Sequence, residues 1–258
     1  MTRIAAIQMV SGPEVAPNLA AAERLIGAAA AAGAQLAALP ENFYMIGRHE
    51  GDKVAVREPD GRGPIQQFLS DVARKNRLWI VGGTAPISTD DEKRIRGACL
   101  VYDDSGKRVG RYDKMHLFRF KNETEQYDEA RTLQPGTRAL AIDSPFGRLA
   151  LSVCYDVRFP ELYRGLGEFD VMFVPSAFTV PTGAAHWETL LRARAIENKA
   201  YLVAPAQGGA HPGGRRTWGH SMIVDPWGEI LALREEGEGV VLAEIDPQRI
   251  QDVRRRLN

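Results

Sequence analysis

The sequence predicts an α/β protein, a single domain over residues 1–258, in which two β-sheets pack together and helices cover them. Three observations support this prediction. Strand-like and helix-like runs alternate early in the chain, the apolar runs are too many for one flat sheet, and no linker, repeat or low-complexity tract divides the sequence. Two packed sheets with helices outside bury that many apolar strands. A chain of this length can bury such a core in one domain.

The first third of the chain predicts three strands and two helices. The strands are expected over 4–10, 34–40 and 78–84, and the helices over 18–33 and 64–76. Asn18 is the predicted N-cap of the first helix and Gly33 its end, because a side-chain amide satisfies free N–H groups and glycine accepts a left-handed backbone. Pro64 begins the second helix, where proline removes no hydrogen bond.

The rest of the chain predicts mainly strands. An antiparallel hairpin is expected about the Asp-Ser-Gly turn of 97–114, with further strands over 149–156, 170–176, 200–206, 219–226 and 239–247. Helices are expected over 186–200 and at the end of the chain, where 254–256 supply three arginines. The glycine-rich segment 207–219 lacks the Gly-Lys-Ser/Thr ending of a phosphate loop and is expected to be a surface or rim loop.

Composition excludes several classes of function. The 33 basic and 33 acidic residues give a formal net charge of zero, which predicts neither a nucleic-acid partner nor an anionic membrane surface. Cys99 and Cys154 are too few for a disulfide scaffold, so a reducing, cytoplasmic location is expected. The chain shows no signal peptide and no apolar run long enough for a membrane helix.

Three predicted strands end on a reactive side chain: Glu41 in "LPENF", Lys114 in "YDKMHLF" and Cys154 in "LSVCYD". Each alone has an ordinary structural interpretation, as a surface charge or a buried apolar thiol. Together they complement one another, because a thiol needs a base or a cation to become nucleophilic. Glu41 would accept the thiol proton, Lys114 would stabilise an oxyanion, and the backbone N–H of Tyr155 would be a second oxyanion donor.

Other chemistries have weaker support. A cysteine–histidine hydrolase would need a histidine at a strand end opposite Cys154, and none of the five histidines has that position. The scattered histidines and the absence of a Cys-x-x-Cys motif predict no metal site. A thiol redox protein would need a resolving cysteine near Cys154, whereas Cys99 lies in the predicted hairpin.

The stretches "LPENF", "YDKMHLF" and "SVCYDVRFPELYR" resemble the nitrilase, or carbon–nitrogen hydrolase, superfamily, and the resemblance extends over nearly the whole chain. It implies a four-layer α-β-β-α sandwich with no cofactor. By this resemblance Glu41 is the general base, Lys114 stabilises the oxyanion and Cys154 is the nucleophile. The resemblance also assigns Glu129, before "LQPG", to orienting Lys114 and keeping it charged.

The segment after the cysteine resembles the amidase branches, above all ω-amidases and deaminated glutathione amidases, more than nitrilases. This implies a small carboxylate-bearing amide as substrate, with N-carbamoyl amino acids or nitriles as alternatives. Arg158 is a candidate for the carboxylate, although a salt bridge to Asp156 or Glu161 is its alternative role. Further candidates for the pocket lining are Tyr44, Phe178 and Thr179.

Three questions stay open from the sequence. Acyl transfer instead of hydrolysis, and a binding protein that keeps the fold without activity, are alternatives to an amidase. The charged segment 119–129 is expected at the pocket rim with an undefined effect on specificity. By family analogy, the segments 158–166 and 186–200 are expected to form the interface of a homodimer or larger homo-oligomer.

Overall fold

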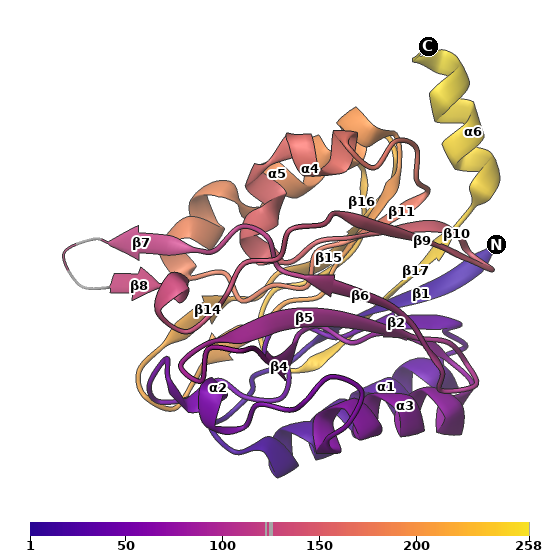
Figure 1. Cartoon of the computed structure of the whole chain (residues 1–258). Helices are drawn as coiled ribbons and strands as arrows, with labels where there is room; N and C mark the ends of the chain where they lie inside the picture. Colours follow the sequence, from indigo (N-terminus) through magenta and orange to yellow (C-terminus); the bar gives the residue numbers. More distant parts are fainter. Residues whose placement is uncertain (122, 124–125, 258) are drawn as a thin grey trace.

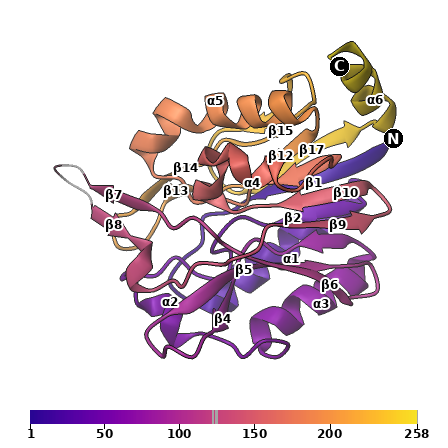
Figure 2. The ribbon, with the colours of Figure 1, turned by 45° about the horizontal axis from the view of Figure 1, so that its top comes forward.

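The computed structural model describes residues 1–121, 123 and 126–257. Two β-sheets pack face to face, and helices lie on the outer face of each sheet (Figure 1). Figure 2 shows the same four layers from a second direction. The α-β-β-α architecture is therefore confirmed.

The first sheet consists of β1 (Thr2–Gln8), β2 (Leu36–Ala38), β3 (Trp79–Val81), β4 (Ala85–Ser88), β5 (Ile95–Tyr102), β6 (Arg108–Asp113) and β17 (Gly239–Ile245). The strand order is β17-β1-β2-β3-β5-β4, and β6 also pairs with β5. Strands β2 and β3 are parallel, β5 is antiparallel to β3, and β6 is antiparallel to β5. Strands β2 and β6 therefore run in the same direction, and the residues that follow them lie at the same end of the sandwich.

The second sheet consists of β9 (Leu140–Ser144), β10 (Gly147–Leu151), β11 (Val171–Phe173), β12 (Tyr201–Ala204), β15 (Ser221–Val224) and β16 (Ile230–Arg234), in the order β16-β15-β12-β11-β10-β9. Strands β10, β11 and β12 are parallel. A parallel bridge between Met9, just after β1, and Gln207, just after β12, joins the two sheets. The segment after β10 is therefore brought to the same end of the sandwich as the segments after β2 and β6.

Helices α1 (Val15–Ala31) and α3 (Pro64–Asn76) cover the first sheet, and α4 (Pro160–Arg164) and α5 (Val180–Asn198) cover the second (Figure 1). The remaining elements are short or terminal: α2 (Asp52–Ala55), α6 (Pro247–Arg256), the 3-10 turns η1 (Glu129–Arg131) and η2 (Cys154–Arg158), and two small hairpins, β7 (Arg119–Lys121) with β8 (Gln126–Asp128) and β13 (Gly208–Ala210) with β14 (Arg216–Trp218). Both small hairpins lie at the end of the sandwich that the three strand-end residues share.

Alternation along β1 illustrates how the layers are filled. Successive strand side chains point to opposite faces of a sheet. Ile4 and Ala6 belong to the apolar cluster between the two sheets, whereas Ala5 and Ile7 belong to the cluster under α1 and α3. All four side chains are fully buried, which accounts for the continuous apolar run in the sequence.

Two helix boundaries differ from the prediction. Asn18 is not an N-cap: the helix begins at Val15, and the buried Asn18 side chain instead bonds the backbone of Gly12 and the carbonyl of Tyr44. The predicted helix 186–200 begins earlier, at Val180. Proline is tolerated in a first turn, and Gly183 packs so closely on Trp218 that an added Cβ would lie 2.2 Å from the ring.

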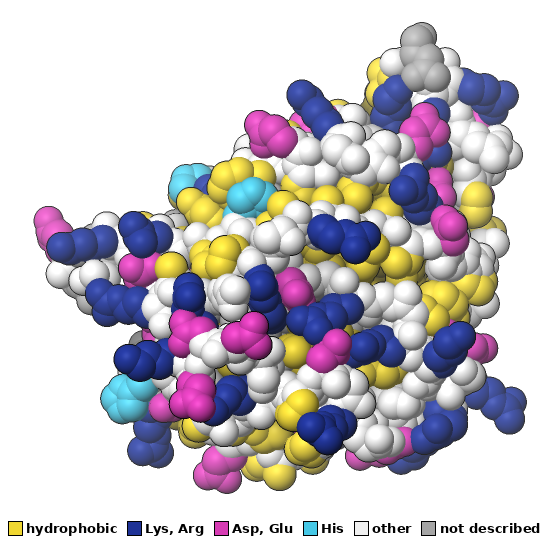
Figure 3. Space-filling view, in the orientation of Figure 1, with side chains coloured by type: hydrophobic (Ala, Val, Ile, Leu, Met, Phe, Trp, Pro, Cys, Tyr) yellow, Lys and Arg dark blue, Asp and Glu magenta, His cyan; other side chains and the backbone are white. Residues whose placement is uncertain are grey.

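The distribution of charged side chains on the surface agrees with the net charge of zero. Basic and acidic side chains are interspersed over the face seen in Figure 3, and do not gather into a large basic patch there. Within the described residues, no helix combines the length and apolar character that a membrane crossing requires. The predicted helix at the end of the chain is confirmed as α6.

Candidate active site

Glu41 lies in a turn just after β2, where Pro40 ends the strand. Its backbone is held from two sides: Gln207 Nε2 donates to the Glu41 carbonyl over 3.2 Å, and the next N–H, that of Asn42, donates to Thr84 Oγ1 over 2.8 Å. The Glu41 side chain is buried. Its carboxylate therefore has a defined direction, toward the end of β6.

Lys114 follows β6 directly and is only 2% exposed. Its ammonium group donates to Glu41 Oε1 over 2.8 Å and to both oxygens of Glu129, Oε1 and Oε2, over 2.9 and 2.8 Å. Burial by itself would lower the pKa of Lys114, but Glu129 and then Glu41 outweigh burial and raise it well above its usual value. The buried lysine is therefore held as a cation by two carboxylates.

Glu129 opens the short turn η1. Besides Lys114, its carboxylate accepts a hydrogen bond of 2.7 Å from the backbone N–H of Phe118. Burial would raise the pKa of this carboxyl group, yet Lys114 and then Lys53 lower it below its usual value. The predicted rim segment 119–129 forms the small hairpin of β7 and β8 beside this turn, although its residues 122, 124 and 125 lie outside the described residues.

Cys154 begins η2, three residues after β10, and is 6% exposed. Its φ is +51°, in the left-handed region that residues with a Cβ rarely adopt. Its N–H donates to the Pro175 carbonyl, and its sulfur accepts from the N–H of Ala177. Such backbone strain is typical of nucleophiles at sharp strand-to-helix turns.

The electrostatic surroundings of the thiol favour its neutral form. Burial is the largest cause that raises the pKa of Cys154 well above its usual value, and Glu41 raises it further. Lys114 acts in the opposite direction, without reversing the shift. The resting cysteine is therefore a thiol, and not a free thiolate, with the Glu41 carboxylate near enough to raise its pKa.

Asp156 joins the lysine segment to the cysteine segment. Its Oδ2 accepts from Tyr112 Oη over 2.7 Å and from the N–H of Val153 over 2.8 Å. Its Oδ1 accepts from the backbone N–H of His116 over 2.9 Å and lies 2.7 Å from His116 Nδ1. From the sequence, Asp156 was predicted only as a partner for Arg158. Its true role is to fix two strand ends relative to each other.

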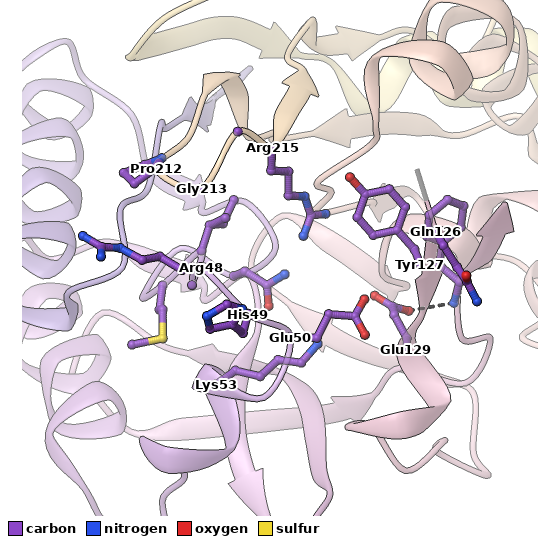
Figure 4. A pocket seen from close by; sticks show the side chains of 16 residues that line it. Arg48, His49, Glu50, Lys53, Gln126, Tyr127, Glu129, Pro212, Gly213 and Arg215 are labelled. Carbon is purple, nitrogen blue, oxygen red and sulfur yellow. Dashed lines mark hydrogen bonds between the residues drawn. The ribbon is translucent and has the colours of Figure 1, made fainter. Parts of the chain in front are cut away.

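Two spaces open near these residues. A narrow recess of about 10 Å³, room for one water-sized group, is lined by Cys154, Tyr155, Phe178 and Thr179 among others. A larger cavity of about 340 Å³ lies between α2, which carries Lys53, and the hairpin of β13 and β14 (Figure 4). Phe118 lines both spaces. The segment 207–219 therefore forms part of the rim, as predicted, but as a hairpin.

The predicted pocket residues divide into two groups. Phe178 and Thr179 line the recess beside the sulfur, and the backbone N–H of Tyr155 forms no hydrogen bond within the described part of the chain. Tyr44 is 1% exposed and packs in the core against Phe43, so it lines neither space.

Arg158 also lies outside both spaces. Its guanidinium lies over the rings of Tyr155 and Phe178, each 5.5 Å away, and is 3.2 Å from His186 Nδ1. The alternative expectation, a salt bridge to Asp156 or Glu161, is wrong: no such ion pair exists among the described residues, because Asp156 is occupied by the four donors above.

Several residues of the site were missed from the sequence. Gln207 and Arg215 come from the glycine-rich segment, and Lys53 from the short helix α2. Gln207 lies three residues after β12, as Glu41 lies three residues after β2, so the strand-end pattern that singled out Glu41 would also have found it. Within residues 1–121, 123 and 126–257, no three His, Cys, Asp or Glu side chains are arranged to hold a metal ion.

The fold and this buried Glu-Lys-Cys arrangement define a hydrolase of the nitrilase type, and a family model described as carbon-nitrogen hydrolase matches residues 3–255. The chain belongs to the carbon–nitrogen hydrolase family. It is 43% identical over 260 residues to a deaminated glutathione amidase of Synechocystis sp., covering 98% of this chain and 94% of that protein.

The comparison with solved structures agrees with this family assignment. The Caenorhabditis elegans NitFhit protein superimposes with a TM-score of 0.91 at 37% identity, over 99% of this chain and 63% of that longer one. Saccharomyces cerevisiae Nit3, described as a member of branch 10 of the nitrilase superfamily, superimposes with a TM-score of 0.88 at 31% identity, over 99% of this chain and 94% of the other.

Proposed function

We propose that this protein is an amidase that hydrolyses the C–N bond of a small carboxylate-bearing amide through a thioester on Cys154. The observation that carries the proposal is the strained, nearly buried Cys154 beside the Lys114 ammonium, which two carboxylates hold. Membership of the carbon–nitrogen hydrolase family supports it.

Acylation follows from the positions of three groups. The Cys154 thiol attacks the amide carbonyl carbon while its proton passes to the Glu41 carboxylate. The carbonyl oxygen becomes an oxyanion, which the Lys114 ammonium and the free N–H of Tyr155 stabilise. When the C–N bond breaks, Glu41 returns the proton to the departing nitrogen, so the amine leaves neutral and the acyl group stays on sulfur.

Deacylation uses the same groups, with water in place of the thiol as the nucleophile. Water attacks the thioester carbonyl while Glu41 accepts its proton, and the new oxyanion occupies the same two donors. The tetrahedral intermediate then expels the sulfur of Cys154, which regains a proton from Glu41, and the carboxylic acid leaves. Glu129 contacts Lys114 and stays outside the bond changes, so it is a positioning residue that keeps the lysine charged and aligned.

The relatives suggest the substrate class. Proteins described as deaminated glutathione amidase from Synechocystis sp. and from Homo sapiens are 43% and 37% identical to this chain. We therefore propose deaminated glutathione, or an ω-amide such as α-ketoglutaramate, as the substrate. N-carbamoyl amino acids and nitriles are the weaker candidates, and the substrate that is consumed distinguishes them from the amides.

The test combines products with a covalent intermediate. Deaminated glutathione, α-ketoglutaramate, succinamate, aliphatic amides, N-carbamoyl amino acids and nitriles are incubated with the full chain, and both the acid and the amine or ammonia are quantified. Acid quenching followed by intact mass measurement should show an acyl adduct in wild type and in Cys99→Ala, but not in Cys154→Ala. Repeating the reaction with an added amine separates hydrolysis from acyl transfer. No product and no adduct with any substrate would refute the proposal.

We also propose that the chain forms a homodimer or larger homo-oligomer in the cytoplasm, through the side of the molecule that carries α4 and α5. Ile196 of α5 is 43% exposed, and Gly228, next to the half-exposed Trp227, approaches it so closely that an added Cβ would lie 2.6 Å from Ile196. The turn that contains Trp227 and Gly228 therefore lies beside Ile196. Sedimentation of wild type and Ile196→Glu tests the assembly, which the substitution should weaken.

A further inference from the structure

The two groups that exchange a proton in the proposed reaction belong to different sheets. Glu41 follows β2 of the first sheet, and Cys154 follows β10 of the second. Asp156 joins the segments of Lys114 and Cys154, and the four donors to its carboxylate all come from those two segments. The direction in which Glu41 faces the thiol therefore depends on other contacts between the sheets.

The side chain of Gln207 provides such a contact. It is fully buried, three residues after β12. Its Nε2 donates to the Glu41 carbonyl over 3.2 Å and to Ser11 Oγ over 2.8 Å, and its Oε1 accepts from the N–H of Ser11 over 3.0 Å. Because the N–H of Ser11 can only donate and the carbonyl of Glu41 can only accept, these partners fix the orientation of the amide.

Ser11 extends this hydrogen bonding to the far side of the same turn. It lies after β1 and is buried. Its Oγ accepts from Gln207 and donates to the carbonyl of Phe43 over 2.9 Å. The carbonyls of Glu41 and Phe43 are therefore both held, and a rotation of the turn would leave buried polar groups without partners, which is costly.

The backbone of Gln207 contacts the segment that supports the nucleophile. Its N–H donates to the Ser176 carbonyl over 2.9 Å. Both neighbours of Ser176 bind Cys154. The carbonyl of Pro175 accepts from the cysteine N–H over 2.9 Å, and the N–H of Ala177 donates to the sulfur. One residue thus contacts the turn of the base through its side chain and the support of the thiol through its backbone.

We propose that Gln207 is a positioning residue, whose amide fixes the Glu41 carboxylate relative to the Cys154 thiol across the two sheets. The inference rests on the proposed amidase function and adds a residue to it. Gln207 acts through the backbone of Glu41 and touches no reacting atom. Because Glu41 also gives a proton to the departing nitrogen, a displaced carboxylate should slow the cleavage of amides most.

A comparison of an amide with an ester of the same acid isolates this effect. The pair consists of the amide that the wild type hydrolyses best and the p-nitrophenyl ester of its acid, because p-nitrophenolate leaves without a proton whereas an amine needs one. In Gln207→Met, the ratio of kcat/KM for the amide to kcat/KM for the ester should fall on the order of tenfold. A smaller fraction of folded enzyme lowers both values equally and leaves the ratio unchanged.

Two further variants test the hydrogen bonds separately. Gln207→Glu keeps an oxygen that accepts from Ser11, but its carboxylate cannot donate to the Glu41 carbonyl, so the ratio should fall as in Gln207→Met. Ser11→Ala removes one acceptor of the amide and should lower the ratio by about two- to fivefold. The double variant Ser11→Ala/Gln207→Met should fall little below Gln207→Met, because both side chains act on one turn.

Gln66→Met is the matched control. Gln66 is also buried, and its Nε2 donates to the carbonyls of Pro59 and Arg62 just before α3. This substitution removes the same kind of side-chain amide from a place that contacts neither Glu41 nor the support of Cys154. The amide-to-ester ratio of Gln66→Met should therefore stay within about twofold of wild type.

Hydrogen–deuterium exchange tests the contact without hydrolysis. The segment 42–46, directly after Glu41, is protected by backbone hydrogen bonds within itself and to the loop after β1. Gln207→Met should speed exchange in this segment about 5- to 10-fold, the effect of losing one buried hydrogen bond, and Gln66→Met should leave it unchanged.

The outcomes separate the two proposals. An unchanged ratio in Gln207→Met, or an equal fall in Gln66→Met, overturns the positioning role even if the wild type is an active amidase. Unchanged exchange in the segment 42–46 of Gln207→Met overturns it as well. Faster exchange there, in a chain whose wild type hydrolyses no amide and forms no adduct, supports the contact and refutes the proposed reaction.

Discussion

Replacing Asp156 tests whether the alignment of the strand ends depends on one buried carboxylate. Asp156 is fully buried, and its two oxygens accept from four donors: two backbone N–H groups, of His116 and Val153, the ring of His116 and the hydroxyl of Tyr112. Asp156→Asn leaves the volume almost unchanged but converts one acceptor oxygen into a donor. Its effect therefore reports hydrogen bonding and charge, and not packing.

The structure gives the magnitude. The Tyr112 hydroxyl and the His116 ring can exchange donor and acceptor roles, whereas the two backbone N–H groups cannot. Because these N–H groups bond different oxygens of Asp156, either orientation of the asparagine amide leaves one of them facing an NH2 group. An orphaned buried N–H costs about 1–3 kcal/mol. The free energy of unfolding should fall by about that amount, and kcat/KM by on the order of tenfold, as the lysine and cysteine segments lose alignment.

Urea denaturation followed by far-UV circular dichroism measures the first effect, and steady-state hydrolysis of the best amide measures the second. Asp143→Asn is the control, since Asp143 is exposed and its side chain accepts no hydrogen bond from another described residue. That control should stay within about 0.5 kcal/mol of wild type. If Asp156→Asn behaved like Asp143→Asn in both measurements, the positioning role of Asp156 would be wrong.

Three further predictions concern the same end of the sandwich and one control helix. Glu129→Gln should move the alkaline limb of the kcat/KM profile to lower pH, because Glu129 helps to raise the pKa of Lys114 well above its usual value; a limb at the wild-type pH would contradict this. The stability from that lysine is present below its unfolded pKa and is lost as pH rises through its folded pKa, so urea denaturation should show the loss at lower pH in Glu129→Gln than in wild type. Gly83→Ala should cost at least about 2 kcal/mol and most of the activity, because the added Cβ would lie 2.1 Å from the Pro40 carbonyl oxygen, beside the turn that carries Glu41. Gly27→Ala on α1, where no atom lies within 4 Å of the added Cβ, should instead stabilise by about 0.5–1 kcal/mol, and an equal response of both glycine variants to urea would refute the steric argument.

Local signals in the sequence were sufficient to predict which residues stand at the ends of the strands. Proline directly after β2, and the change from apolar to charged residues after β6 and β10, identified Glu41, Lys114 and Cys154, and the structure brings these three residues to one end of the sandwich. The direction of β6 relative to β2 follows from one intervening antiparallel strand. Glu129 was found through the family resemblance alone, since its strand and turn have no apolar periodicity.

Local signals in the sequence could not predict the contacts between segments that are far apart in the chain. Gln207 bonds the carbonyl of Glu41 from 166 positions away, and this pairing depends on how the two sheets are joined after β1 and β12. Asn18 was misassigned for a related reason: its amide is an ordinary cap in sequence, but the neighbouring loop at Gly12 and Tyr44 competes for it. Polar side chains near element ends are thus where tertiary structure overrides local preference.

The charges of the site suggest why a buried thiol would be left neutral. Two carboxylates surround one ammonium, so a resting thiolate would add a second excess negative charge. Burial first, and then the Glu41 carboxylate, raise the pKa of Cys154 accordingly. In the proposed reaction, the proton that leaves Cys154 neutralises Glu41, and one N–H donor of Lys114 becomes available as the oxyanion forms. The excess negative charge then stays at one throughout, and only its position changes. A site built in this way stabilises the transition state more than the free thiolate, which is the condition for catalysis.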